Sequence, residues 1–317
     1  MSLHIYRRYF FVGIILLSCS LFSLFFKLDA TNSKLILWEL RLPRLLLAVA
    51  VGGALSLSGA VMQTVLGNPL ADPYTLGIAS GAALGAAIGM TLNSSFSFLG
   101  LNLGAVIGAG LVLLVLLKTL ARSNSEPNSG VLVGVMLSLT CASLLAIWMA
   151  LSDPLGVQSI NFWLLGDLSR GTLVSALGLC TLTLGGSIYF FLSSKTLDAF
   201  LFGEDLVHTF GVSIERTRKI AILLISILVG FSVSAVGMIG FVGLVVPHLV
   251  RKSLGTSRHY HLLPLSVLWG AVILTLSDVL AKWVGDPHEL PVGAVTAVVG
   301  APVFIYLFLK PRNISLG

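Results

Sequence analysis

Apolar runs long enough to cross a lipid bilayer recur along the whole of this 317-residue chain. A bilayer-spanning helix needs about 20 apolar residues, because its backbone must satisfy its own hydrogen bonds in hydrocarbon. The runs are continuous rather than alternating, and 56% of the residues are hydrophobic, which argues against a transmembrane barrel and an ordinary soluble domain. We therefore predict an all-α, polytopic membrane protein that forms a single domain over residues 1–317. The clear runs lie near 9–26, 45–66, 76–92, 98–117, 130–151, 173–192, 262–284 and 291–309.

The apolar run at 220–252 is too long for one span and too short for two complete ones. It contains Gly237, Gly240 and Gly243, so we place a break near Gly237–Gly240. Basic residues collect on the cytoplasmic side of membrane proteins. With the N-terminus inside, the 19 Lys and Arg residues divide 9 inside and 10 outside for an unbroken run, but 13 inside and 6 outside for a broken one. We predict ten membrane segments, the eighth too short to cross alone, with both termini cytoplasmic.

A weak internal repeat supports the broken segment. Shifting the chain by 178 residues aligns 45–77 with 223–255 and matches ten of 33 positions. In the ten-segment topology the two copies enter the membrane from opposite sides, and inverted repeats with an interrupted helix are typical of transporters. We expect repeat halves near 40–192 and 220–310. The informative matches are Gly52/Gly230, Ser56/Ser234, Gly59/Gly237, Pro69/Pro247 and Gly77/Gly255.

Glycines recur at helical spacing in two neighbouring runs. The stretch GAALGAAIG places Gly81, Gly85 and Gly89 on one helix face, and GAVIG adds Gly104 and Gly108. Small residues at this spacing let membrane helices approach closely. We predict that these two helices pack tightly against each other.

Ionisable residues are missing from the interiors of spans two to five. The main exception elsewhere is Asp278, four residues before Lys282, a spacing that favours an ion pair on one helix face. A carrier driven by protons or sodium ions would keep ionisable or ion-coordinating groups near the bilayer centre, so their absence indicates another energy source.

Motifs for enzymatic chemistry are missing as well. The sequence has no H-E-x-x-H, G-x-S-x-G or P-loop pattern, so we expect neither an enzyme nor a chain that binds ATP itself. The six histidines are scattered through loops and segment ends, and we expect no metal site among them. The net charge of +6 comes from short loops, where it sets topology rather than binding nucleic acid.

Residues 195–219, called the polar segment below, carry eight charged side chains in 25 residues. Gly203 and Gly211 bracket about two helical turns, and the topology puts the segment in the cytoplasm between spans six and seven. Glu204 and Asp205 disfavour contact with an anionic lipid surface. We therefore predict that the segment docks on a partner protein. Its apolar stripe would consist of Leu201, Phe202, Leu206, Phe210 and Val212.

Three stretches closely resemble the FecCD-type permeases of ABC importers for iron–siderophore complexes, haem and vitamin B12. They are LRLPRLLLAVAVGGALSLSGAVMQTVLGNPLADPYTLGIASGAALGAA (40–87), GFVGLVVPHLVRKSLG (240–255) and ELPVGAVTAVVGAPVFIYLFLK (289–310). The stretch FGEDLVHTFGV is similar to that family's LGEExAxxLGV coupling element, with Phe202 and Phe210 where Leu is usual and with Val207 and His208 in place of smaller residues. The resemblance runs nearly end to end, and the combination RLPR, SGAVMQ and NPLADP is very specific.

The resemblance implies a homodimer around a central path, two separate ATPase subunits that bind ATP and Mg²⁺, and a binding protein that delivers substrate to the outer face. It implies ATPase coupling through Phe202, Gly203, Glu204, Leu206, Phe210, Gly211 and Val212. It implies docking of the binding protein on Arg41, Arg44 and Lys282, although snorkelling would also explain these basic residues. It implies an inner gate at Asn68, Leu70, Asn128 and Ser129, although Asn68 before Pro69 also suits a bare turn.

The expected function is that of the membrane-spanning subunit of an ATP-driven importer of a large iron chelate, with a siderophore first, in a bacterial inner membrane. Haem and cobalamin importers of the same type stay open, because the sequence does not reveal the cargo. An ion-coupled secondary transporter would lose uptake to an uncoupler while ATP is intact. A membrane enzyme or passive channel would need no binding protein and would leave the polar segment without a role. We expect no cofactor on this chain and no nucleic-acid partner.

Overall fold

A computed structural model describes residues 2–25, 33–92, 98–122, 129–203, 207, 213–285 and 288–309 of the chain. Regular structure within these residues is helical throughout. In chain order the elements are α1 (Ser2–Phe25), α2 (Ser33–Leu35), the π-helix η2 (Ile36–Arg41), α3 (Leu42–Val65), the 3₁₀-helix η3 (Pro73–Leu76), α4 (Ile78–Leu92), α5 (Phe98–Arg122), α6 (Ser129–Leu151), α7 (Pro154–Leu164), α8 (Leu173–Leu192), α9 (Ser194–Ala199), the 3₁₀-helix η4 (Phe200–Phe202), α11 (Ile214–Val236), α12 (Val242–Leu254), α13 (His259–Gly285) and α14 (Val292–Leu309).

Each predicted membrane segment coincides with a helix, which confirms the all-α polytopic fold. In the described part of the chain, seven helical stretches are long and apolar enough to cross a membrane, and they contain α1, α3, α5, α6, α8, α11 and α13. The helices α4 and α14 are shorter and apolar. The tenth, α12, has 13 residues and spans about 20 Å. It therefore cannot cross a hydrocarbon core of about 30 Å.

The run at 220–252 is broken where the sequence predicts. Helix α11 ends at Val236, and α12 begins at Val242. Gly237 has a φ of 75°, a region that glycine enters without steric cost. Phe241, with a φ of 69°, is the described residue other than glycine that adopts a positive φ. The break thus follows from the local conformation as well as from the length of the run.

The sequence patterns do not predict α7, which lies between the fifth and sixth spans. Its start is capped by Asp153, whose carboxylate accepts a hydrogen bond from the Gly156 N–H at 3.1 Å, and Pro154 occupies the first turn. Asp at the cap followed by Pro is a common way to begin a helix. With 11 residues, α7 is too short to cross the bilayer, so the number of spans is unchanged.

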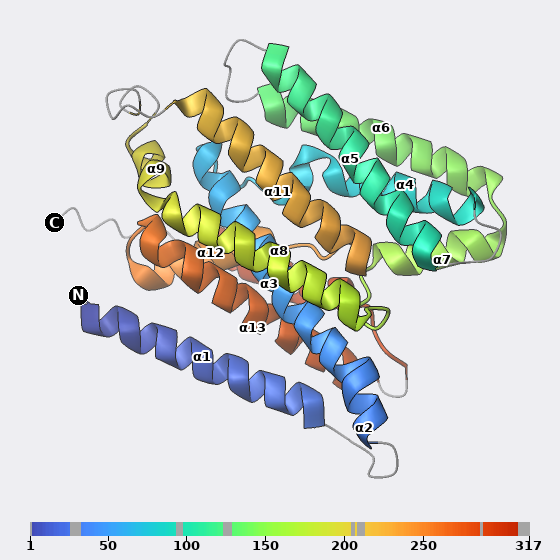
Figure 1. The fold of residues 1–317 in the computed structure, drawn as a ribbon, viewed down its shortest axis with the longest axis horizontal. Coiled ribbons are helices and arrows are strands. Elements are labelled where there is room, and N and C mark those ends of the chain that lie inside the picture. The colour runs from blue at the N-terminus through green and yellow to red at the C-terminus, as the bar shows by residue number, and fades with distance from the viewer. Residues whose placement is uncertain are drawn as a thin grey trace.

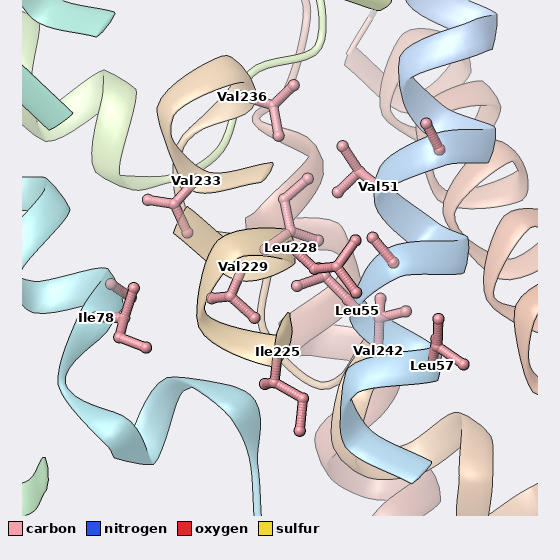
Figure 2. Packing of buried hydrophobic residues seen from close by; sticks show 14 of the residues in the cluster. Val51, Leu55, Leu57, Ile78, Ile225, Leu228, Val229, Val233, Val236 and Val242 are labelled. Carbon is pink, nitrogen blue, oxygen red and sulfur yellow. The ribbon is translucent and has the colours of Figure 1, made fainter. Parts of the chain in front are cut away.

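Helix α3 lies in the middle of the bundle, with α13, α8, α12 and α11 packed around it (Figure 1). Nearly every residue from Pro43 to Val65 is buried. Figure 2 shows Leu228 of α11 lying against Val51 and Leu55 of α3. The helices α4 to α7 form a group on one side of the molecule, and α1 lies on the opposite side (Figure 1). The core is therefore a layer of apolar side chains around one central helix.

The two ends of the bundle are distinguished by contacts of α1. At its start, the Arg8 guanidinium donates to the Ser253 carbonyl, so this end lies beside the end of α12. Helix α9, at the start of the polar segment, packs on α13 at the same end. At the opposite end, Arg41 Nη1 donates to the Leu24 carbonyl at 2.7 Å. The N-terminal end of α1 and the polar segment therefore lie on the same side.

Glycine pairs let helices approach until their backbones meet. An ideal Cβ on Gly85 of α4 would lie 2.1 Å from the Gly104 carbonyl oxygen of α5. One on Gly59 of α3 would lie 1.8 Å from the Gly243 carbonyl oxygen of α12. The first pair confirms the close packing predicted from the glycine spacing. The second pair seats the short α12 directly on the central helix.

Gly59→Ala should destabilise the protein by about 1–3 kcal/mol, the usual cost of overpacking. The new methyl group would meet a backbone carbonyl, which cannot rotate away as a side chain can. The unfolding temperature in detergent measures the effect. Gly178→Ala on α8 is the matched control, since a Cβ there meets nothing within 4 Å and alanine favours a helix. Equal losses from both substitutions would contradict this account of the packing.

Candidate functional site

Four charged side chains form a cluster where the start of α3 meets the end of α13. Arg44 Nε lies 2.8 Å from Asp278 Oδ1, and Arg44 Nη1 lies 2.6 Å from Glu289 Oε2. Lys282 Nζ lies 2.8 Å from Asp278 Oδ2, which confirms the ion pair predicted from their spacing. The Asp278 side chain is 1% exposed and that of Arg44 9%, whereas that of Glu289 is 54% exposed. The cluster is therefore buried at its centre and open to solvent at Glu289 and, to a smaller degree, at Lys282.

Two of the three predicted docking residues belong to this cluster. Arg44 and Lys282 are brought together by Asp278, while Arg41 ends η2 one turn before Arg44. Because the Arg44 charge is neutralised inside the chain, it does not project from the rim. The exposed Glu289 is the partner that an external carboxylate could replace. Docking of a binding protein on these residues stays a prediction.

The predicted gate residue Asn68 closes a tight turn after α3. Its side-chain Oδ1 accepts a hydrogen bond from the Leu70 N–H at 2.9 Å, and its carbonyl accepts one from the Ala71 N–H at 3.1 Å. Asn commonly makes this kind of turn. Leu70 is 47% exposed. Ser129 begins α6, but its side chain and the whole of Asn128 lie outside the described residues, so the gate stays a prediction.

Tyr74 of η3 holds the break between α11 and α12. Its hydroxyl donates to the Ile239 carbonyl and accepts from the Ile239 N–H, both at 3.1 Å. The Asp167 N–H donates to the Val236 carbonyl at 2.7 Å. Backbone groups freed by a broken helix need such partners inside a membrane, where water cannot replace them. A residue from the first repeat copy therefore stabilises the interruption in the second.

Asp72 fixes the position of this tyrosine. Its carboxylate caps η3 by accepting the Tyr74 N–H at 3.0 Å. Burial raises the pKa of Asp72, and the hydrogen bond from the Tyr74 N–H acts in the opposite direction. The capped carboxyl and the tyrosine therefore form one rigid turn beneath the broken helix.

A small apolar cluster holds described residues of the polar segment together. Val207 is fully buried and packs with Ala199 and Ile214, and Phe200 lies against them. Gly203 has a φ of 90°, and Phe202 is 63% exposed. The other predicted coupling residues lie outside the described part of the chain and stay predictions. They are Glu204, Leu206, Phe210, Gly211 and Val212.

The charged cluster and the polar segment lie at opposite ends of the central helix. Arg44 of the charged cluster is in the first turn of α3. Thr64, which His259 links to Asp198 of the polar segment, is in the last turn. The two residues are about 30 Å apart along the helix at 1.5 Å per residue. That distance matches the thickness of a hydrocarbon core. The arrangement can therefore contact one partner on each face of a membrane and connect the two through one helix.

Sequence reasoning missed the roles of Tyr74 and Glu289. Both lie inside stretches that are informative in other ways, NPLADPYTLG and ELPVGAV. Their partners are far away in the chain, since Ile239 lies 165 positions after Tyr74 and Glu289 lies 245 positions after Arg44. The sequence does show that Tyr74 and Glu289 each stand just before an apolar run, where a polar side chain can reach the end of a helix. That position alone does not identify the residue to which the side chain bonds.

Comparisons of sequence and of structure with known proteins all indicate the same family. The sequence profile of the FecCD transport family matches residues 7–310. The vitamin B12 import system permease protein of Vibrio cholerae is 36% identical over 313 residues, which cover 96% of this chain and 94% of that protein. The hemin transport system permease protein of Yersinia pestis is 36% identical, with 87% and 83% covered. A solved metal-chelate type ABC transporter in an inward-facing conformation superposes with a TM-score of 0.88 at 29% identity, covering 96% of this chain and 99% of that one.

Proposed function

Because the chain belongs to the FecCD transport family and is the permease of an ATP-binding-cassette importer, we propose that it carries a bulky metal chelate across a bacterial inner membrane. The family match over residues 7–310 is the observation that supports this most strongly. The proposed cargo is an iron–siderophore complex. Cobalamin or haem is the second candidate, favoured by relatives named for vitamin B12 and hemin import, both 36% identical to this chain.

The proposed assembly contains two copies of this chain around the path. Helix α6 supports it, because most of its side chains are left uncovered by the rest of one copy. Thr140 and Ser143 are exposed on this helix three residues apart, so they share a face. The Thr140 hydroxyl donates to the Met136 carbonyl within α6, and the exposed Ser143 suits a wet surface between two subunits better than hydrocarbon. The absence of fixed charge in spans two to five would let a large chelate pass without being held tightly.

ATP and Mg²⁺ would be bound by two separate ATPase subunits, with no cofactor on this chain. The polar segment would dock on them from the cytoplasm, where both termini would also lie. The contacts of Arg8 support this placement, since they put the start of α1 at the end of the bundle that holds α9. Transport would alternate inward and outward openings, with the population of each set by ATP in the partner subunits.

The cargo is tested by what the cognate binding protein retains. Ferrichrome, cyanocobalamin and haemin are offered to the purified binding protein, and uptake of each is measured in proteoliposomes that contain the complete transporter. We expect retention of the ferric siderophore and uptake that needs ATP but survives an uncoupler. Uptake that stops with an uncoupler at constant ATP would contradict ATP coupling. Retention of cyanocobalamin or haemin alone would move the assignment to the second candidate.

Arg41→Glu should slow capture of the binding protein by roughly tenfold at low salt, because rim charges mainly steer the encounter. Arg41→Gln is the milder comparison. Arg44 is unsuitable for this test, since a glutamate there would face Asp278 and Glu289. The association rate on nanodisc-embedded transporter gives the measurement, and an unchanged rate at low salt would refute docking at Arg41.

A further inference from the structure

A partly buried chain of hydrogen bonds joins the polar segment to the last turn of α3. His259, the first residue of α13, is fully buried. Its Nδ1 lies 2.7 Å from Asp198 Oδ1, and its Nε2 lies 2.7 Å from Thr64 Oγ1. The His259 backbone N–H also donates to Asp198 Oδ1, at 2.8 Å. Asp198 is in α9, within the polar segment, so three separate elements meet at one imidazole.

The hydrogen-bonding capacities of these groups decide which atom donates. A carboxylate only accepts, so His259 Nδ1 carries the proton and donates to Asp198. In a neutral imidazole Nε2 then accepts, and the single hydroxyl hydrogen of Thr64 must point to it. The Ala60 carbonyl, 3.0 Å from the Thr64 hydroxyl, still receives Arg251 Nη2 at 3.3 Å. Each group in the chain therefore has a partner, and the order of donors is unique for the neutral ring.

The same turn of α3 is also tied to α12. The Arg251 guanidinium donates to the Gln63 side-chain oxygen, and Gln63 Nε2 donates to the Leu244 carbonyl at 3.2 Å. Residues 60–64 are thus tied directly to α13, through His259 to α9, and through Gln63 and Ala60 to the short α12. The opposite end of α12, at Val242, follows directly on the break that is stabilised by the hydrogen bonds of Tyr74.

Directional contacts transmit movement differently from apolar ones. A shift of about 1–2 Å, typical of helix movements in switching proteins, would break hydrogen bonds of 2.7 Å unless the bonded elements moved together. The apolar packing of Val207 on Ala199 and Ile214 lies within the polar segment itself, so it does not connect the segment to α3. The hydrogen-bonded chain is therefore a contact through which the polar segment can pull or push on the helix core, beside the longer hydrogen bond of 3.4 Å from Arg218 Nε to the Val65 carbonyl.

We propose that Asp198, His259 and Thr64 are positioning residues that transmit displacement of the polar segment to α3 and, through Gln63 and Arg251, to α12. The inference rests on the proposed docking of the ATPase on the polar segment. It assigns the start of α13 a role in transport for which neither the repeat nor the coupling motif gives an indication.

The test compares Thr64→Val with Thr183→Val in the complete transporter with its ATPase subunits. Both substitutions remove one buried hydroxyl that contacts α3, and Thr183 donates to the Ala50 carbonyl away from the chain of interest. Hydrogen–deuterium exchange is measured without nucleotide and with ATP plus vanadate. In the natural protein and in Thr183→Val, nucleotide should change exchange in peptides from 195–219, 60–66 and 242–254. In Thr64→Val the change at 195–219 should remain, and the changes at 60–66 and 242–254 should be lost.

A second pair of variants keeps the test decisive if Thr64→Val does not assemble. Asp198→Asn retains a side-chain acceptor and should behave like the natural protein, whereas Asp198→Ala should behave as described for Thr64→Val. Unchanged responses at 60–66 would overturn the proposal. Loss of the response in all three regions would also overturn it, because the chain would then only support the docking surface. If nucleotide alters no region of the natural protein, the docking proposal itself fails, whereas a response confined to 195–219 refutes only the link.

Discussion

Replacing Leu206 and Phe210 with aspartate should detach the ATPase subunits and abolish uptake, while the chain still inserts into the membrane. Residues four apart on a helix share one face, and buried apolar anchors carry most of the affinity of an interface. Loss of two anchors at about 2 kcal/mol each corresponds to roughly a thousandfold in affinity. A carboxylate at such a contact adds a desolvation cost. Co-purification of the ATPase and uptake by intact cells measure the result.

The control for this pair is Phe210→Leu, which keeps an apolar side chain and restores the residue usual in the family. It should retain both ATPase binding and uptake. The described apolar packing within the segment runs through the buried Val207 rather than through positions 206 and 210, so aspartate at those two positions should leave the fold intact. Retained ATPase binding in the double aspartate variant would contradict the coupling role.

Asp278→Ala should lower the free energy of unfolding by about 3–5 kcal/mol, the usual cost of breaking a buried ion pair by removing one partner. The Asp278 carboxylate is 1% exposed and is bonded to both Arg44 and Lys282. Its loss would leave two cations close together, with only the exposed Glu289 to balance Arg44. Unfolding in lipid bicelles or detergent, followed by helix content, measures the loss.

Two comparisons separate charge from packing in that experiment. Glu215→Ala breaks the exposed Lys219–Glu215 pair and should cost no more than about 0.5 kcal/mol. Adding Arg44→Met and Lys282→Met to Asp278→Ala should recover most of the lost stability, because no unpaired charge is left buried. If the triple variant is as unstable as Asp278→Ala alone, the loss comes from packing rather than from stranded charge.

The sequence predicted those features that depend on counting along the chain. The break at Gly237 follows from the length of one apolar run and from the distribution of basic residues around it. The pair of Asp278 and Lys282 follows from a spacing of four on a helix. The start of α7 could have been predicted in the same way, since Asp153 and Pro154 form an ordinary cap. The polar residues around Asp153 and Pro154 made the stretch look like a loop, although the two residues are a recognisable start of a helix.

The rest could not be predicted because it depends on contacts between distant parts of the chain. Arg44 lies 234 residues from Asp278, and Thr64 lies 195 residues from His259. A histidine at the start of a helix resembles any loop residue until packing encloses it. The same limit applies to Arg44, for which the sequence indicates docking of a binding protein and not the buried cluster in which it lies. Burial and pairing change what a charge can do, and neither is visible in the order of residues.

The interruption between α11 and α12 also limits what can bind inside the bilayer. Ion-driven carriers use the loose carbonyl groups of interrupted helices as ligands for sodium. Here the carbonyls of Val236, Ile239 and Gly240 already accept hydrogen bonds from the Asp167 N–H, the Tyr74 hydroxyl and the Val242 N–H. A bare cation would have to break these bonds before it gained a ligand. The break therefore interrupts the helix while the protein itself supplies donors to these three carbonyls.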